Sequence, residues 1–112
     1  MKTFGKYILE GKKIVECNNL LEWAKWMKTA DKVVKQVNLS NGFCVSTVFL
    51  GLERSLLETV KPLLFETMVF DNRKKGLDKY EDLDLDRCST WEEAEKMHKK
   101  MVKKWKKFKV RK

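Results

Sequence analysis

The chain has 112 residues, of which 43% are hydrophobic and 37% are charged, a composition that suits one domain with a modest core and excludes a disordered chain. The formal net charge is +9, and every apolar run is far shorter than the roughly 20 residues needed to cross a bilayer. The sequence therefore predicts a single domain over residues 1–112, with no membrane span and, since no signal peptide is recognisable, a cytoplasmic location.

The first part of the chain predicts a hairpin followed by a helix. Two short apolar segments, 6–9 and 13–15, flank a glycine-containing turn. Asn19 is a candidate N-cap, and Glu22 three residues later completes a variant of the capping box. Apolar residues then recur at helical spacing, so we expect a short amphipathic helix over about 19–29.

The middle of the chain predicts three strands, because the segments 33–39, 43–50 and 63–70 are rich in β-branched and aromatic residues. The Asn41-Gly42 pair between the first two is a strong hairpin signal, since it accepts the positive φ angles of a tight turn. The second segment is apolar on both faces, which indicates a central strand. The connection over 51–61 is long enough to be a functional loop.

The C-terminal part predicts a polar loop over 71–87 and then a long helix. Two overlapping capping boxes, Ser89 with Glu92 and Thr90 with Glu93, mark the start of the helix. Apolar residues at spacings of three and four then form one stripe, which runs to about residue 108. The expected fold is α+β: a mostly antiparallel sheet of about five strands, with the short helix (about 19–29) and the long C-terminal helix (about 89–108) packed on it.

The positive charge is concentrated at the end of the chain. Residues 96–112 contain ten of the 25 basic residues and no acidic residue, so the remainder is nearly neutral. The pattern fits a solvated helix face over the core, contact with nucleic acid or another polyanion, or contact with a membrane surface. We expect 109–112 to be a flexible basic arm. The candidate residues for binding a polyanion or an acidic partner are Lys99, Lys100, Lys103, Lys104, Lys106, Lys107, Lys109 and Arg111.

An acidic stretch before the long helix has the spacing of a calcium loop but not its glycine. Asp82, Asp84, Asp86 and Glu93 occupy positions 1, 3, 5 and 12 of an EF-hand loop, whereas Arg87 stands where the sharp turn requires glycine. We therefore expect no metal site, and interpret the stretch as an acidic segment before a helix N-terminus, where negative charge is favoured.

Two residues are weak candidates for catalysis. Glu66 lies within a predicted strand, where it either faces solvent or is a partly buried carboxylate with a raised pKa. His98 is the only imidazole, and it lies at the edge of the apolar stripe, where a structural histidine is the commoner finding. A small enzyme or nucleotide-binding protein would need the 51–61 loop, Glu66 and His98 to converge. No glycine-rich phosphate loop or other cofactor motif is present, so we expect no cofactor.

Several long sequence segments resemble those of a widespread family of small, uncharacterised bacteriophage and prophage proteins. They are VSTVFLGL (45–52), PLLFETMVF (62–70) and STWEEAEKMHKKMV (89–102), and the opening YILEGKKIV and the helix LLEWAKWM are similar to that family too. The resemblance covers nearly the whole chain. One departure is that family members tend to continue the second strand with Leu-Asp-His, whereas here Leu52 is followed by Glu53-Arg54.

The resemblance implies no particular enzymatic activity, because none is established for that family. It implies a phage-type accessory protein in the cytoplasm of a bacterial host cell. We expect non-catalytic binding to a host protein complex or a nucleic acid through the basic C-terminal helix, with interference in a host defence or regulatory complex as the specific hypothesis. Sequence-nonspecific nucleic-acid binding and the small enzyme described above are the alternatives.

Overall fold

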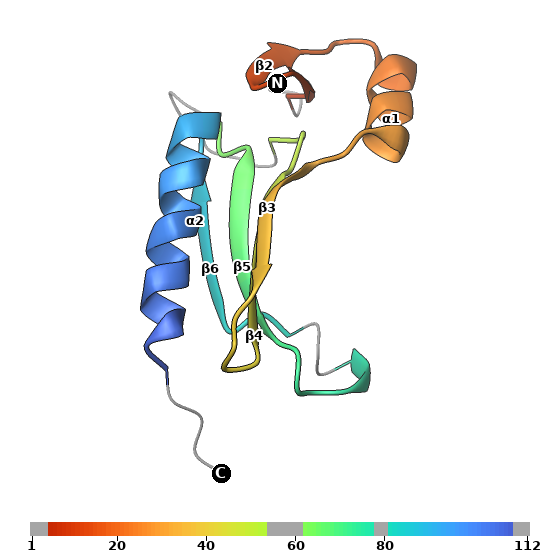
Figure 1. The fold of residues 1–112 in the computed structure, drawn as a ribbon. Coiled ribbons are helices and arrows are strands. Elements are labelled where there is room, and N and C mark those ends of the chain that lie inside the picture. Colours follow the sequence, from red (N-terminus) through yellow and green to blue (C-terminus); the bar gives the residue numbers. More distant parts are fainter. Residues whose placement is uncertain (1–4, 54–61, 78–80, 109–112) are drawn as a thin grey trace.

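The computed structural model describes residues 5–53, 62–77 and 81–108, and it shows an α+β fold (Figure 1). The elements are β1 (Tyr7–Glu10), β2 (Lys13–Glu16), α1 (Leu20–Thr29), β3 (Val33–Asn38), β4 (Phe43–Phe49), β5 (Phe65–Asp71), β6 (Asp84–Cys88) and α2 (Trp91–Lys106). The fold class and both helices are confirmed. The strands differ from the expected single sheet of about five, because β1 and β2 form a two-stranded sheet and the others form a four-stranded antiparallel sheet in the order β3-β4-β5-β6.

The Asn41-Gly42 turn joins β3 to β4 as predicted. Gly42 has a φ of +98°, and the side chain of Asn41 accepts a hydrogen bond from the backbone N–H of Phe43 at 3.3 Å. The turn sets the register in which Val37 lies opposite Val45. Because β4 pairs with β3 on one side and β5 on the other, it is the central strand that its two apolar faces predicted.

The prediction of a loop over 71–87 is wrong at its end, where residues 84–88 form the edge strand β6. This strand pairs with β5 so that Leu85 lies opposite Met68. Aspartate is depleted in strands, which is why the segment reads as a loop. Here the backbone N–H groups of Leu85 and Arg87 each donate to the carboxylate of the preceding aspartate at 2.9 Å, so the acidic residues satisfy backbone donors of the strand.

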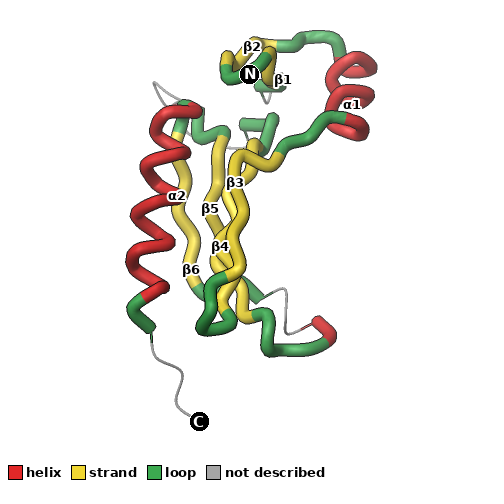
Figure 2. The backbone as a smooth tube through the Cα atoms, in the orientation of Figure 1, coloured by secondary structure: helices red, strands yellow, loops and turns green. Residues whose placement is uncertain are grey.

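Helix α2 covers one face of the four-stranded sheet, and the core lies between them (Figure 1). One buried cluster consists of Phe43, Val45, Val69, Met101 and Trp105, and a second consists of Phe49, Leu64, Phe65, Ala94 and Met97. The β1–β2 sheet and α1 lie at one end of the four-stranded sheet (Figure 2), so the molecule is elongated, with extents of 51 × 28 × 28 Å. Neither helix of the described part of the chain is long and apolar enough to cross a membrane.

Helix α1 is attached mainly through two tryptophans, since none of its residues is buried. Asn19 caps its start by accepting a hydrogen bond from the N–H of Glu22, as predicted. The indole N–H of Trp23 donates to the backbone carbonyls of Tyr7 and Gly51, at 3.2 and 3.0 Å. Trp26 contacts Phe49 edge-on, with ring centroids 5.7 Å apart. The helix is therefore held against the end of β4.

Substitution of Gly51 by alanine tests this attachment. Gly51 has a φ of +73°, and an added Cβ would lie 2.6 Å from the Met27 sulfur and 3.3 Å from the Tyr7 carbonyl oxygen. We expect Gly51→Ala to lower the free energy of unfolding by about 2 kcal/mol in urea denaturation. Gly11→Ala is the matched control, because Gly11 has a φ of +63° but nothing within 4 Å, and we expect it to cost about 1 kcal/mol. Equal losses would show that Met27 accommodates the added methyl group.

Candidate functional site

The basic helix is fixed at its start by the predicted capping box. The hydroxyl of Thr90 accepts a hydrogen bond from the N–H of Glu93 at 3.2 Å and donates to the Glu93 carboxylate at 3.1 Å. Thr90 is the N-cap, so of the two overlapping boxes it is the second that starts the helix. The buried residues Ala94, Met97 and Met101 then direct one side of α2 to the sheet.

The opposite side of α2 is covered with lysines, which we call the lysine face. Its members are all exposed: Lys96, Lys99, Lys100, Lys103, Lys104, Lys106 and Lys107. At a rise of about 1.5 Å per residue, this face is about 16 Å long. Among the described residues, only Lys104 of this set forms an ion pair. The other two predicted binding residues, Lys109 and Arg111, and the predicted arm 109–112 lie outside the described residues.

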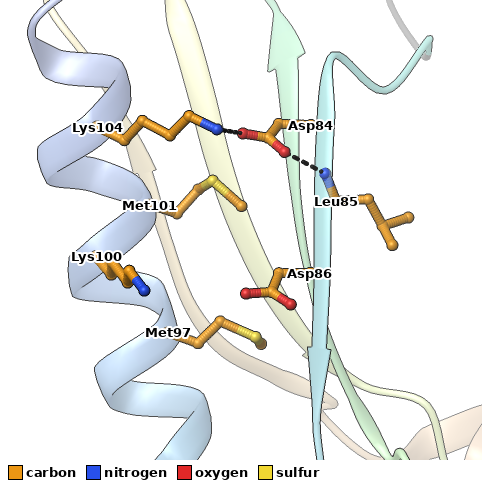
Figure 3. Close-up of a pocket in the computed structure, with 7 residues that line it drawn as sticks. All are labelled: Asp84, Leu85, Asp86, Met97, Lys100, Met101 and Lys104. Carbon is orange, nitrogen blue, oxygen red and sulfur yellow. Dashed lines mark hydrogen bonds and ion pairs between the residues drawn. The ribbon is translucent and has the colours of Figure 1, made fainter.

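Lys104 is engaged within the molecule, at a cleft between α2 and β6 (Figure 3). Its ammonium group lies 2.7 Å from a carboxylate oxygen of Asp84, and the same oxygen accepts the indole N–H of Trp105 at 2.9 Å. The hydrogen bonds from Lys104 and then Trp105 hold the pKa of Asp84 below its usual range. The cleft has a volume of about 230 Å³, with Met97 and Met101 among its lining residues. Lys104 is therefore a structural residue at the border of the lysine face.

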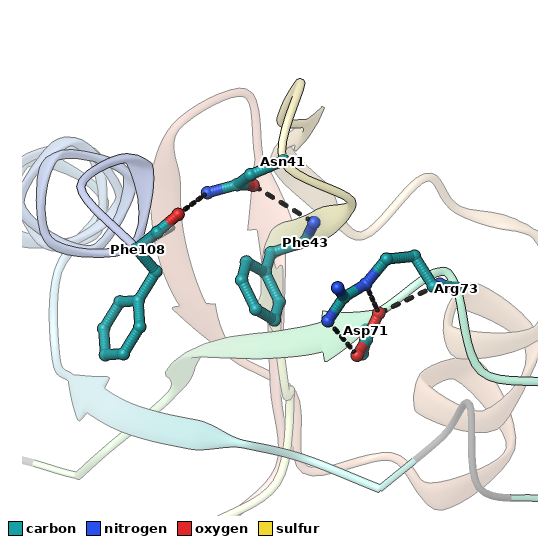
Figure 4. Close-up of polar contacts among 5 residues, drawn as sticks. All are labelled: Asn41, Phe43, Asp71, Arg73 and Phe108. Carbon is teal, nitrogen blue, oxygen red and sulfur yellow. Dashed lines mark hydrogen bonds and ion pairs between the residues drawn. The ribbon is translucent and has the colours of Figure 1, made fainter. Parts of the chain in front are cut away.

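The C-terminal end of α2 is held by a side chain from the β3–β4 turn (Figure 4). The Asn41 amide nitrogen donates to the backbone carbonyls of Trp105 and Phe108, at 2.9 and 3.0 Å. Phe108 stacks on Trp105 with ring centroids 4.4 Å apart and an interplanar angle of 18°. The Trp105 carbonyl in the last turn of α2 and the Phe108 carbonyl beyond it therefore share a side-chain donor, which fixes the chain as far as residue 108.

An arginine lies beside Phe43, the first residue of β4 (Figure 4). The guanidinium of Arg73 makes two hydrogen bonds with the carboxylate of Asp71, at 2.8 and 2.7 Å, and lies 5.1 Å from the centre of the Phe43 ring. The hydrogen bonds from Arg73 hold the pKa of Asp71 below its usual range. The charge of Arg73 is therefore compensated, and its position is fixed.

His98 is a buried structural histidine. It is 2% exposed, and its Nδ1 atom lies 2.7 Å from the hydroxyl oxygen of Thr47, which lies 2.5 Å from that of Thr67. Burial, and to a smaller extent the charge of Lys35, lower the pKa of His98. The three side chains form a continuous polar chain between α2 and the two central strands.

Glu66 does not approach His98. Glu66 and Thr67 are successive residues of β5, so their side chains point to opposite faces of the sheet. His98 lies on the face of Thr67, to which it is connected through the Thr47 hydroxyl. Glu66 is 7% exposed and makes an ion pair with Arg87 of β6 at 2.8 Å, so it does not face solvent. Most of the 51–61 loop, residues 54–61, lies outside the described residues. The convergence of Glu66 and His98 that a small enzyme would need is absent.

The acidic residues with the spacing of a calcium loop form strand and capping contacts instead. Asp84 and Asp86 belong to the strand β6 rather than to a loop, and Asp82 precedes it. Asp84 is occupied by Lys104 and Trp105, and Glu93 by the helix cap. In the described ranges, no three His, Cys, Asp or Glu side chains come together as a metal-binding group.

Sequence reasoning missed two features of this region. The sequence predicts only a turn position for Asn41, although its side chain also caps a helix end 64 residues further along the chain. The apolar stripe that runs to about residue 108 predicts a packed position for Phe108, yet Phe108 is 47% exposed. The signal for the second is its place as the last apolar residue of the stripe, two residues beyond the end of α2 at Lys106.

Comparison of the chain with protein-family models, with curated proteins and with solved structures gives no match.

Proposed function

We propose that the protein is a non-catalytic binding protein whose lysine face contacts the phosphates of a nucleic acid. The observation that carries this proposal is the lysine face itself. It has six exposed lysines of α2 and Lys107 at its C-cap, of which only Lys104 has a carboxylate partner among the described residues. Like charges one turn apart on a helix destabilise it by a few tenths of a kcal/mol per pair. A polyanion removes that repulsion and releases its own counterions.

The helix dipole explains only part of the charge distribution. Lys103, Lys104 and Lys106 lie in the last turn of α2, where positive charge is favoured. Lys96 and Lys99 lie in the first ten residues of the 16-residue helix, where the dipole gives no such advantage. A solvated helix would not require lysine at these positions, whereas a surface for a long polyanion would.

The choice of lysine favours contacts with the nucleic-acid backbone over recognition of base sequence. Of the 25 basic residues, only four are arginine, and three of these lie outside the last 17 residues. Lysine is a point charge without the planar fork that reads guanine. We therefore propose binding with little sequence preference.

Salt dependence of the affinity tests the proposal. If about five lysines neutralise phosphates, the logarithm of the association constant should fall with the logarithm of the salt concentration with a slope of about −4. Lys103→Glu with Lys107→Glu should lower the affinity for a labelled oligonucleotide more than tenfold at about 50 mM salt, measured by fluorescence anisotropy.

A second double substitution controls for net charge. Lys25→Glu with Lys28→Glu makes the same charge change on exposed residues of α1, at the other end of the molecule. We expect this variant to retain most of the affinity. Equal losses in the two variants, or no binding at low salt, would exclude the lysine face as a nucleic-acid site.

The resemblance to small phage and prophage proteins suggests in which cell, and against which kind of target, the protein acts. We propose a phage-type accessory protein that acts in the cytoplasm of a bacterial host, where it interferes with a defence or regulatory complex. Affinity capture from host lysate, with and without nuclease, separates the two kinds of partner. Capture that survives nuclease treatment and is lost in the Lys103→Glu, Lys107→Glu variant would indicate an acidic protein partner instead of a nucleic acid.

A further inference from the structure

An exposed aromatic ring adjoins the C-terminal end of the lysine face. One face of the Phe108 ring stacks on Trp105, yet 47% of Phe108 remains exposed. Phe43 contacts both rings edge-on, with centroid distances of 4.9 Å to Trp105 and 6.3 Å to Phe108. The three rings therefore form a continuous aromatic cluster that begins in the core and ends at the surface.

The exposed ring is held in place from two sides. The carbonyl of Phe108 accepts a hydrogen bond from Asn41, and the Trp105 ring on which it stacks is anchored by its own hydrogen bond to Asp84. A ligand that stacks on Phe108 would therefore lose little free energy in ordering the site.

Exposed lysines precede this ring along the chain. Lys106 and Lys107 immediately precede Phe108 and are exposed, and Lys103 lies one helical turn before Lys107. None of these three lysines forms an ion pair with another described residue. Cationic groups beside an exposed aromatic ring are the combination that single-strand-binding proteins use, with phosphates on the cations and a base on the ring.

We infer that the lysine face and Phe108 together bind single-stranded nucleic acid, with one nucleobase stacked on Phe108 and the adjacent phosphates on Lys103, Lys106 and Lys107. The inference rests on the proposed phosphate binding and names the class of nucleic acid. In a duplex each base is already stacked between its neighbours, so only an unpaired base has a free face for the ring. The lysines alone would bind both forms.

The test compares single-stranded and duplex oligonucleotides of about 15 residues by fluorescence anisotropy at about 50 mM salt. We expect the wild type to bind oligothymidylate more tightly than the duplex. Phe108→Leu should lower the affinity for the single strand about tenfold and leave the affinity for the duplex unchanged. Phe108→Tyr should bind the single strand like the wild type, because it retains a planar ring.

Two controls separate base stacking from a structural effect. Leucine keeps an apolar side chain against Trp105, so the Phe108→Leu variant should unfold at the urea concentration of the wild type. Leu21→Ala removes another exposed apolar side chain, 81% exposed on α1, and should change neither affinity.

The outcomes distinguish the two proposals. If Phe108→Leu binds the single strand like the wild type while Lys103→Glu with Lys107→Glu does not, the stacking inference is wrong and phosphate binding stands. Equal loss of single-strand and duplex affinity in Phe108→Leu also overturns the stacking inference, because the ring would then contribute to binding when no unpaired base is present. If neither oligonucleotide binds at low salt, both proposals fail.

Discussion

Acidification from pH 7 to pH 5 is expected to destabilise this protein through His98. In the unfolded chain a histidine has a pKa of about 6.5, whereas in the folded chain burial and the charge of Lys35 lower the pKa of His98. Between the two values the unfolded state binds more protons, so the free energy of unfolding decreases as the pH falls. The stabilisation that neutral His98 gives the folded state is complete above pH 6.5. Below pH 6.5 the free energy of unfolding falls by up to about 1.4 kcal/mol per pH unit.

Substitution of His98 by glutamine isolates this effect. His98 is the only histidine of the chain, so no other imidazole titrates in the same range. Glutamine retains a polar group for the Thr47 hydroxyl but does not titrate. Urea denaturation at a series of pH values should show the decrease in the wild type and a flat profile for His98→Gln between pH 7 and 5. A decrease of the same size in the variant would place the titrating group elsewhere.

Most of the helical structure could be predicted from the sequence because its determinants are local. The start of α2 depends on Thr90 and Glu93, which are three residues apart, and the start of α1 on Asn19 and Glu22. The Asn41-Gly42 turn is likewise set by adjacent residues. In each case the residues that satisfy the backbone are within one turn of each other.

The strand β6 could not be predicted in this way, and two other errors follow from that. Its segment is acidic, and it becomes a strand only because β5 offers it a pairing edge. Arg87 of β6 is the partner of Glu66, so a sequence without that strand predicts a carboxylate that faces solvent or is free for catalysis. Asp84 of β6 is the partner of Lys104, which in the sequence is indistinguishable from the free lysines around it.

The lysine face shows the same distinction between local and tertiary information. Its position opposite the apolar stripe follows from helical periodicity, so the sequence predicted it. Which of the described lysines remain unpaired depends on β6, and the position of Phe108, which stacks on Trp105 but remains 47% exposed, depends on tertiary contacts. The lysines of the candidate site could therefore be predicted from the sequence, whereas the exposure of Phe108 could be seen only in the structure.

Loss of the Asp84 carboxylate is expected to destabilise the fold markedly. Its side chain accepts hydrogen bonds from the Trp105 indole, the Lys104 ammonium group and the backbone N–H of Leu85. Asp84→Ala leaves the donor of Trp105, a residue only 9% exposed, without its acceptor, and we expect a loss of about 2 kcal/mol in the free energy of unfolding. The ion pair with Lys104 adds little, because the lysine is largely exposed.

Asp86 provides a matched control on the same strand. It accepts the same kind of hydrogen bond, from the backbone N–H of Arg87, and we expect Asp86→Ala to cost about 0.5 kcal/mol. The low pKa of Asp84 adds a second readout. The stability that it confers is complete above the unfolded value of about 4 and is lost as the pH falls through the folded value, so Asp84→Asn should weaken this acid dependence. Equal urea midpoints for Asp84→Ala and Asp86→Ala would show that the contacts with Trp105 and Lys104 do not stabilise the fold.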